Sequence, residues 1–216
     1  MKLSSPATAL VVQRIRDRIV SGDIPPGAPL RQEDLAARMG VSRIPIRDAL
    51  ARLEAEGLVE IRSDRGAYVA GLDRDRCVEV FDLRVLIECD TLGHAIPRHH
   101  ARSLRAARAI QAELEVEDET MRWLEGDRRF HEALYEPSGR ELSLQMVRTL
   151  RNAVERFCVA RLSHATRRDE WRDEHRDLLE AVAARDSEQA RTCLTRHLRA
   201  TQEVVLSALD EDRSGK

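Results

Sequence analysis

Hydrophobic positions in the last two thirds of the chain recur with the 3.6-residue period of an α-helix. Long runs of Ala, Leu, Glu and Arg favour helices there, and residues that break a helix are few. Breaks fall at Pro97, at Pro137 to Gly139 and around Arg185 to Ser187. The pattern predicts helices near residues 75–96, 100–116, 118–136, 139–164, 168–185 and 187–210.

The first third of the chain has shorter elements. Proline and glycine at residues 25–27 end a first helix, because proline lacks a backbone donor and glycine accepts a positive φ. Apolar and β-branched residues at 58–62 and 67–69 flank a polar Ser-Asp-Arg-Gly turn, a pattern typical of a two-stranded hairpin. We therefore expect a mainly α protein with two domains, residues 1–72 with a small β-hairpin and residues 73–216 entirely helical.

The sequence LAARMGVSRIPIRDAL has the form of a helix, a tight turn at Gly40 and a second helix. Ser42 is placed to cap the second helix, its side chain accepting an amide hydrogen bond of the first turn. Pro45 falls within that turn, where a missing donor costs little. This order of elements, followed by a hairpin, predicts a winged helix-turn-helix unit.

Two arginines lie together on the second helix. Arg43 and Arg47 are one turn apart, on a flank beside an apolar stripe. An arginine in the first turn of a recognition helix can contact guanine bidentately or bind a phosphate. The hairpin tip, Arg65 and Gly66, is expected to reach the flanking groove or the DNA backbone. Surface arginines on a helical hairpin can also serve packing alone, but the combination of elements favours DNA binding.

The composition is that of a globular protein. Hydrophobic residues make up 42% of the 216 residues, and no apolar run is long enough for a transmembrane helix. The N-terminus meets a charge too early for a secretory signal, so we expect a cytoplasmic protein with no membrane partner. The net charge of −2 permits nucleic-acid binding without requiring it. The cysteines form no CxxC pair, which argues against a thiolate metal site.

Three of the predicted helices direct side chains of metal-ligand type inward. Asp127 and His131 share the apolar face of one helix, and His175 and His197 lie on the apolar faces of two others. A single inward histidine is more often a hydrogen-bonded core residue. Together, a carboxylate and an imidazole at i, i+4 and two further imidazoles would suit zinc or another divalent transition metal. Helical periodicity leaves open whether these helices are neighbours.

The string LAARMGVSRIPIRDALARLEAEGLVEIRSDRGAYV closely resembles the winged helix-turn-helix signature of the GntR superfamily of bacterial regulators. The resemblance implies that Arg43, Pro45 and Arg47 line the recognition helix and that Gly66 lies in the wing. Many relatives have an arginine three residues before the alanine at position 36, where this chain has Glu33. Arg31 is the candidate to replace its phosphate contact.

Residues 74–212 resemble the FCD-type ligand-binding domain of the FadR-like GntR subfamily. The resemblance is carried by DRRFHEAL (127–134), DEHRDLLEAVAARD (173–186) and ARTCLTRHL (190–198). It implies an antiparallel helical bundle with a divalent metal in its middle. The implied ligands are Asp127, His131, His175 and His197. Zinc is the metal we expect first, with nickel, manganese and iron as alternatives.

A metal held by four protein ligands can keep or gain a coordination position for a small organic acid effector. Arg84 matches a family arginine in the first helix of the FCD-type domain. Arg148 and Asn152 form an i, i+4 polar pair on the helix that should border the cavity. These three residues are candidate effector contacts, although a chain so rich in arginine also places many on solvated surfaces.

The sequence therefore predicts a ligand-responsive transcriptional regulator, expected to be a repressor, that binds palindromic or near-palindromic operator DNA as a homodimer. A metallohydrolase is one alternative, but the chain has neither an HExxH motif nor a glycine-rich phosphate loop, and Glu132 should face solvent. We accordingly do not expect an enzyme. The other alternative is a direct metal sensor, in which the ion itself is the signal.

Overall fold

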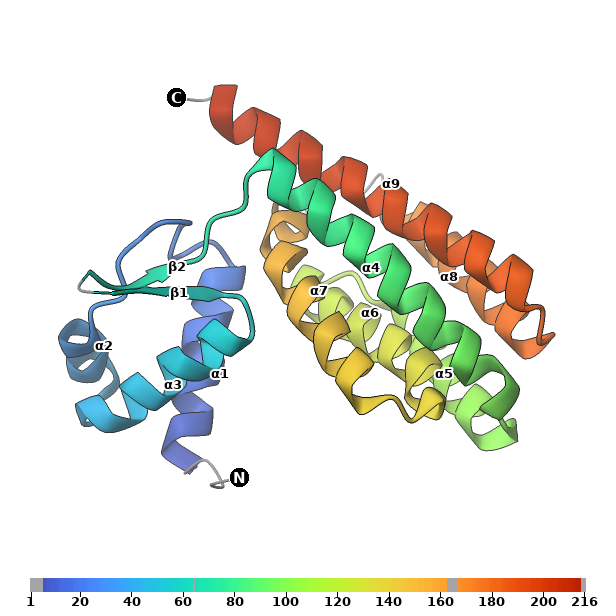
Figure 1. The fold of residues 1–216 in the computed structure, drawn as a ribbon, viewed down its shortest axis with the longest axis horizontal. Coiled ribbons are helices and arrows are strands. Elements are labelled where there is room, and N and C mark those ends of the chain that lie inside the picture. Colours follow the sequence, from blue (N-terminus) through green and yellow to red (C-terminus); the bar gives the residue numbers. More distant parts are fainter. Residues whose placement is uncertain (1–5, 64, 163–166, 215–216) are drawn as a thin grey trace. The chain divides into compact units, whose positions relative to one another are not determined.

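The computed structural model describes residues 6–63, 65–162 and 167–214 and divides into two compact units (Figure 1). The first unit runs to Asp73 and includes Asn152–Arg156, and the second begins at Arg74.

The first unit consists of three helices and a β-hairpin. Its elements are α1 (Pro6–Val20), α2 (Gln32–Met39), α3 (Arg43–Ala55), β1 (Val59–Arg62) and β2 (Gly66–Val69). Apolar side chains from all five elements form one core, in which Ile15, Ile46 and Leu53 are fully buried. The two strands are antiparallel, and their pairing ends with Arg62 opposite Gly66. This is the predicted helix-turn-helix followed by a wing.

The turn between α2 and α3 follows the sequence prediction except at one bond. Gly40 ends α2 in the left-handed conformation, with φ 67°, which glycine adopts without strain. Ser42 is the N-cap of α3 with an extended backbone, but its side chain makes no capping hydrogen bond. The predicted capping bond is therefore wrong. The third residue of α3 is Pro45, which has no amide hydrogen to offer, so one of the two usual donors to a capping serine is missing.

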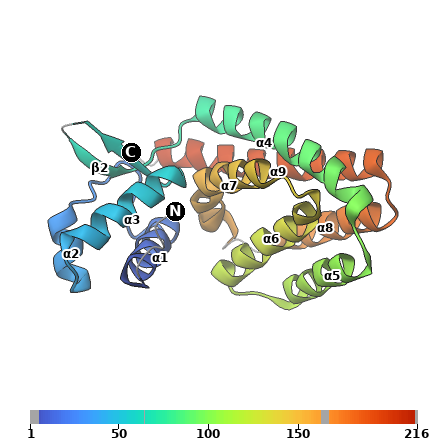
Figure 2. The ribbon, with the colours of Figure 1, turned by 60° about the horizontal axis from the view of Figure 1, so that its bottom comes forward.

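The second unit is entirely helical in its described residues (Figure 2). Its elements are α4 (Arg74–Ala95), η1 (Ile96–Arg98), α5 (Ala101–Val116), α6 (Thr120–Tyr135), η2 (Glu136–Ser138), α7 (Glu141–Leu162, without the Asn152–Arg156 segment), α8 (Arg168–Ala183) and α9 (Ser187–Ser214). The short 3₁₀ helices η1 and η2 contain Pro97 and Pro137, the residues at which breaks were predicted. Helix α9 extends four residues beyond its predicted end.

Ion pairs and hydrogen bonds give the directions of the packed helices. Helices α4 and α9 are antiparallel, because Arg74 pairs with Asp210 at one end and Cys89 contacts Thr195 further along. Helix α9 also packs on α8, and α5 on α6. Helices α5 and α8 are also antiparallel, because Arg172 near the start of α8 donates to the carbonyl of Leu114 near the end of α5, and Arg185 after α8 donates to the carbonyl of His99 before α5. The predicted fold class, a mainly α protein with a winged helix-turn-helix and an antiparallel helical bundle, is confirmed.

Within the described residues, no helix combines the length and the apolar character needed to cross a bilayer.

Candidate metal centre and DNA interface

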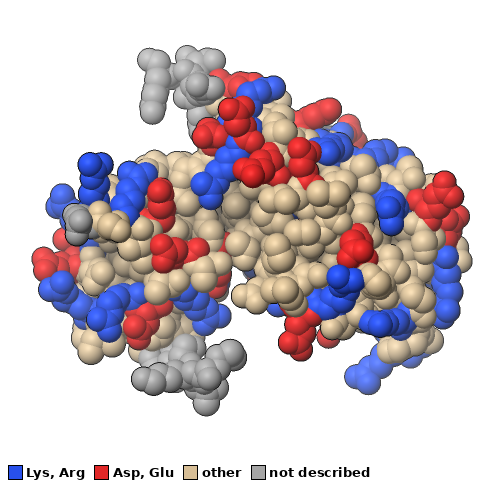
Figure 3. Space-filling view, viewed as in Figure 1, with Lys and Arg blue, Asp and Glu red and all other residues tan. Residues whose placement is uncertain are grey.

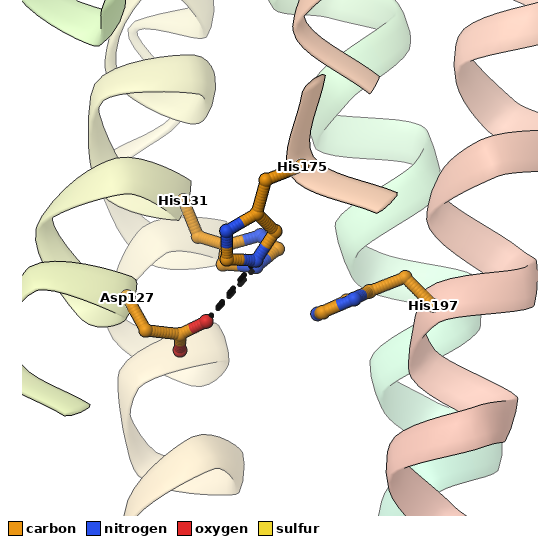
Figure 4. A group of neighbouring side chains, drawn as sticks. All are labelled: Asp127, His131, His175 and His197. Atoms are coloured by element: carbon orange, nitrogen blue, oxygen red, sulfur yellow. Dashed lines mark ion pairs between the residues drawn. The ribbon is translucent and has the colours of Figure 1, made fainter. Parts of the chain in front are cut away.

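The structure brings Asp127, His131, His175 and His197 together inside the second unit (Figure 4). Helix α6 carries the first two residues, α8 carries His175 and α9 carries His197. One potential ligand atom from each residue lies within 4.8 Å of the corresponding atoms of the other three. The four side chains point toward a common centre in Figure 4. The helices that carry the four residues, whose proximity could not be read from periodicity, are therefore neighbours.

Aromatic packing fixes the imidazole rings. His131 and His175 are completely buried, at 0% exposure. The ring of Phe130 stacks on His175 with centroids 4.5 Å apart and meets His131 edge-on at 5.5 Å. The ring of Trp123 stacks on His175 and on Trp171, with ring centroids 6.1 Å and 5.4 Å apart respectively. These contacts come from the apolar faces of α6 and α8, so the same periodicity that builds the core also orients the rings.

One carboxylate oxygen of Asp127 lies close to two of the imidazoles. Its Oδ1 is 3.2 Å from His175 Nε2 and 3.7 Å from His131 Nε2. Both nitrogens are buried without a hydrogen-bond partner among the described residues, because even the shorter contact lacks hydrogen-bonding geometry. Buried nitrogens normally have a hydrogen-bond partner. The space between these two nitrogens and the carboxylate could therefore hold a group that satisfies all three. Three imidazoles and one carboxylate fit a divalent transition-metal ion there.

The outward nitrogens of two rings have partners. His131 Nδ1 lies 3.1 Å from the hydroxyl of Tyr135, and His197 Nδ1 lies 2.9 Å from Glu174 Oε2. His175 Nδ1 has no partner among the described residues. Thus the partnered nitrogens of His131 and His197 face away from the centre.

Protonation states in the cluster suit cation binding. Burial lowers the pKa of His131 well below its usual value and also lowers the pKa of His175, so both rings stay neutral. Burial opposes ionisation of Asp127, but the Arg151 guanidinium and the neighbouring histidines hold the pKa of that carboxyl well below its ordinary value. Neutral imidazoles and an ionised carboxylate are the forms that coordinate metal.

A second layer of charged residues surrounds the cluster. Glu88 on α4 is completely buried and accepts hydrogen bonds from Arg84 Nε and from the Tyr135 hydroxyl, each at 2.7 Å. Arg151 on α7 bonds Asp127 Oδ2 and has its Nη1 3.7 Å from Glu88 Oε2. Arg84 therefore reaches the cluster through Glu88.

The other two predicted effector contacts lie further out. Arg148 is 54% exposed and pairs with Glu132 at 2.8 Å, which leaves it on the surface side of α7. Asn152 is half-buried on the same helix. Glu132 is itself half-exposed beside His131, as expected from its position on α6. The structure thus draws Arg84 toward the cluster and leaves Arg148 at the surface.

The predicted DNA contacts lie on exposed parts of the first unit. The side chains of Arg43 and Arg47 on α3 are exposed, with Arg43 paired to Glu33 at 3.1 Å and Arg47 4.0 Å from the adjacent Asp48. Arg31 is exposed at the N-cap of α2 and lines a cavity of about 190 Å³. Figure 3 shows basic side chains over this unit interspersed with acidic ones.

The remaining predicted contacts follow from the backbone. Ser42 and Pro45 lie in the first turn of the exposed helix α3, and Arg65 and Gly66 lie at the tip of the wing. Gly66 has φ 91°, a left-handed conformation that the tight hairpin requires. All seven predicted contacts are therefore accessible in the first unit, except that Pro45 is half-buried.

Family models and known structures agree with this architecture. The model for bacterial regulatory proteins of the gntR family matches residues 7–69, and the FCD domain model matches residues 79–200, more than half of the chain. The chain belongs to the GntR family and carries an FCD domain.

The relatives of this GntR-family chain are regulators. It is 25% identical to the HTH-type transcriptional repressor RspR of Escherichia coli K12, over 97% of this chain and 93% of the relative. A crystal structure of a GntR-family transcriptional regulator from Pseudomonas syringae pv. tomato is 30% identical, covers 97% of this chain and 88% of its own, and superposes with a TM-score of 0.58. Escherichia coli McbR/YncC, 22% identical over 94% of this chain and 98% of its own, shares the fold with a TM-score of 0.78.

These findings establish a DNA-binding transcriptional regulator rather than an enzyme, which confirms those predictions and the predicted family. The metal, the effector and the individual site residues stay predictions.

Sequence reasoning missed Arg151, the cation beside Asp127. Helix α7 has its buried side at Val147 and Val154, and Arg151 is four residues after the first and three before the second. That spacing was the available signal. The sequence analysis instead selected the polar pair Arg148 and Asn152, which lies on an adjacent side of the same helix.

Replacing Arg151 with Met should destabilise the metal-free protein by about 3 kcal/mol, because Asp127 would lose the cation that compensates its burial. Urea unfolding of chelator-treated protein measures the effect. The matched control is Arg148→Met on the same helix, whose exposed pair with Glu132 should contribute about 1 kcal/mol or less. Equal losses in the two variants would show that Arg151 does not compensate Asp127.

Proposed function

We propose that this chain is a ligand-responsive repressor in which residues 1–72 bind operator DNA and residues 73–216 bind a divalent metal and a small organic acid. The observation that supports the metal site is the convergence of four ligand atoms within 4.8 Å of one another, with buried imidazole nitrogens that have no hydrogen-bond partner in the described part of the chain. Membership of the GntR family supports the DNA-binding function.

The donor set favours a transition metal of intermediate softness. Three imidazole nitrogens and one carboxylate oxygen suit zinc first, and nickel, manganese or iron(II) also accept such ligands. Calcium and magnesium prefer oxygen ligands and are disfavoured. The ion would replace the unsatisfied contacts among Asp127, His131 and His175 with coordinate bonds.

The effector would be an organic anion that completes the coordination of the metal. A carboxylate can bind the ion at an open position and a guanidinium with its other oxygen. Arg84 and Arg151 are arginines with little exposed surface near the cluster, and each of them pairs with Glu88. Arg148 and Asn152 receive weaker support, because the first is exposed and paired with Glu132.

Effector binding would regulate DNA through the helical domain. A coupling free energy of about 1–3 kcal/mol, which is typical of allosteric proteins, changes operator affinity roughly 5- to 150-fold. A homodimer would present two α3 helices to the two halves of a palindromic or near-palindromic operator. The repressor name of the relative RspR supports repression, which the effector would relieve.

Replacing Arg47 with Ala should reduce operator affinity by at least tenfold, because an exposed arginine in the first turns of α3 would contribute about 1–3 kcal/mol to base or phosphate contacts. A gel shift with a selected operator measures it. The control is Arg14→Ala, an exposed arginine of α1. Undiminished binding by the Arg47 variant would remove this residue from the interface.

Replacing His175 with Ala should abolish retention of zinc, because the site would lose one of its four ligands. Metal content after dialysis is measured by elemental analysis. The control is His94→Ala, a histidine that lies half-exposed on α4 beside Asp90. Full zinc stoichiometry in the His175 variant would refute the four-ligand site.

The metal alone should change operator affinity less than about fivefold, since the ion is proposed as a bridge to the effector and not as the signal. Gel shifts compare chelator-treated protein with the same protein reloaded with zinc. A larger change on reloading would favour the direct metal sensor.

A further inference from the structure

We infer that Tyr135 and Glu174 are positioning residues for the proposed metal site, which set the tautomers of His131 and His197 so that both Nε2 lone pairs face the centre. The inference rests on the proposed metal function but concerns residues outside the four ligands. A neutral imidazole has one protonated and one unprotonated nitrogen, and only the unprotonated nitrogen can coordinate a metal. The partner of the outward nitrogen decides which form is present.

At His131 the tautomer follows from counting protons. The Tyr135 hydroxyl has a single hydrogen, and the carboxylate of Glu88, 2.7 Å away, can only accept it. The same oxygen is 3.1 Å from His131 Nδ1 and must therefore accept a hydrogen bond from that nitrogen. His131 is thus protonated at Nδ1, and its buried Nε2, which no described residue hydrogen-bonds, carries the lone pair. Glu88 acts on His131 through Tyr135.

At His197 the carboxylate acts directly. Glu174 Oε2 lies 2.9 Å from His197 Nδ1 and accepts its hydrogen, which again leaves the lone pair on Nε2. Glu174 is held by Arg167 at 3.1 Å, so its orientation does not depend on the histidine alone. Residues 174 and 197 lie on the adjacent helices α8 and α9, and the bond therefore also ties those helices together.

His175 differs from the other two histidines. Its Nδ1 is buried with no hydrogen-bond partner among the described residues, and its ring is held by stacking against Phe130 and Trp123. Among the described residues no acceptor lies behind Nδ1, and Asp127 Oδ1 lies 3.2 Å from the other nitrogen, Nε2, on the side of the centre. Two of the three rings are therefore prepared for coordination before metal arrives, and the third is oriented only by packing.

Partners of this kind alter metal affinity without touching the ion. Loss of a hydrogen-bond partner behind a ligating histidine typically weakens metal binding 10- to 100-fold. Tyr135→Phe removes only the hydroxyl and keeps the ring that fills the core, so the fold is preserved. The variant should bind zinc 10- to 100-fold more weakly than the unchanged protein, by competition with a chromophoric chelator.

The matched control is Glu132→Gln, a half-exposed residue of α6 next to His131, which should leave zinc affinity unchanged. Glu174→Ala should weaken zinc binding as Tyr135→Phe does. Glu174→Gln should lose less, because a glutamine oxygen can still accept the hydrogen of His197 Nδ1.

The decisive readout is made without metal. Nitrogen-15 NMR of labelled histidines in chelator-treated protein reports which ring nitrogen is protonated, and we expect protonated Nδ1 at His131 and His197. Tyr135→Phe should abolish that preference at His131 and leave His197 unchanged. A protonated Nε2 at His131 in the unchanged protein, or the same tautomer in the Tyr135 variant, would overturn the inference. If no variant and no unchanged protein bound zinc, the proposed metal site would fail while this tautomer measurement would still decide the roles of Tyr135 and Glu174.

Discussion

The carboxylate of Asp127, almost buried against three imidazoles, is the constraint on which the second unit depends. A buried charge without compensation costs several kcal/mol, and a neutral histidine carries no opposite charge with which to offset it. Helices α6, α8 and α9 bring the imidazoles, and α7 brings the Arg151 cation. Each of these helices therefore places at least one polar residue of the cluster on its inward side, next to the same charge.

The surrounding layer extends this constraint to α4. Glu88 joins Arg84, Arg151 and Tyr135 in one buried network, so the environment of the cluster includes the first helix of the FCD domain. Helix α4 begins a few residues after the second strand of the wing. An anion that drew Arg84 or Arg151 away from Glu88 would alter the packing of the helix that is covalently closest to the DNA-binding unit.

Local sequence patterns were sufficient to predict the helices and strands, and to predict the helix face on which each candidate metal ligand lies. Asp127 and His131 share one helix, so the 3.6-residue period alone aligned them. The meeting of α6 with α8 and α9 depends on contacts between distant segments, which periodicity does not contain, and only the family resemblance supplied it. Arg151 and Glu88 were missed because periodicity can place a charged residue on a buried face but does not show which distant residue pairs with it. The Ser42 capping bond failed because Pro45 removes a donor, a detail that depends on which amides remain.

The central claim is that one ion binds between Asp127 and the three histidines. X-ray absorption of protein loaded with one equivalent of zinc measures the ligands of that ion directly. The account predicts three imidazole nitrogens and at least one oxygen at about 2.0–2.2 Å, with the multiple scattering typical of histidine rings. A spectrum with fewer than two imidazoles, or with sulfur among the ligands, would contradict it.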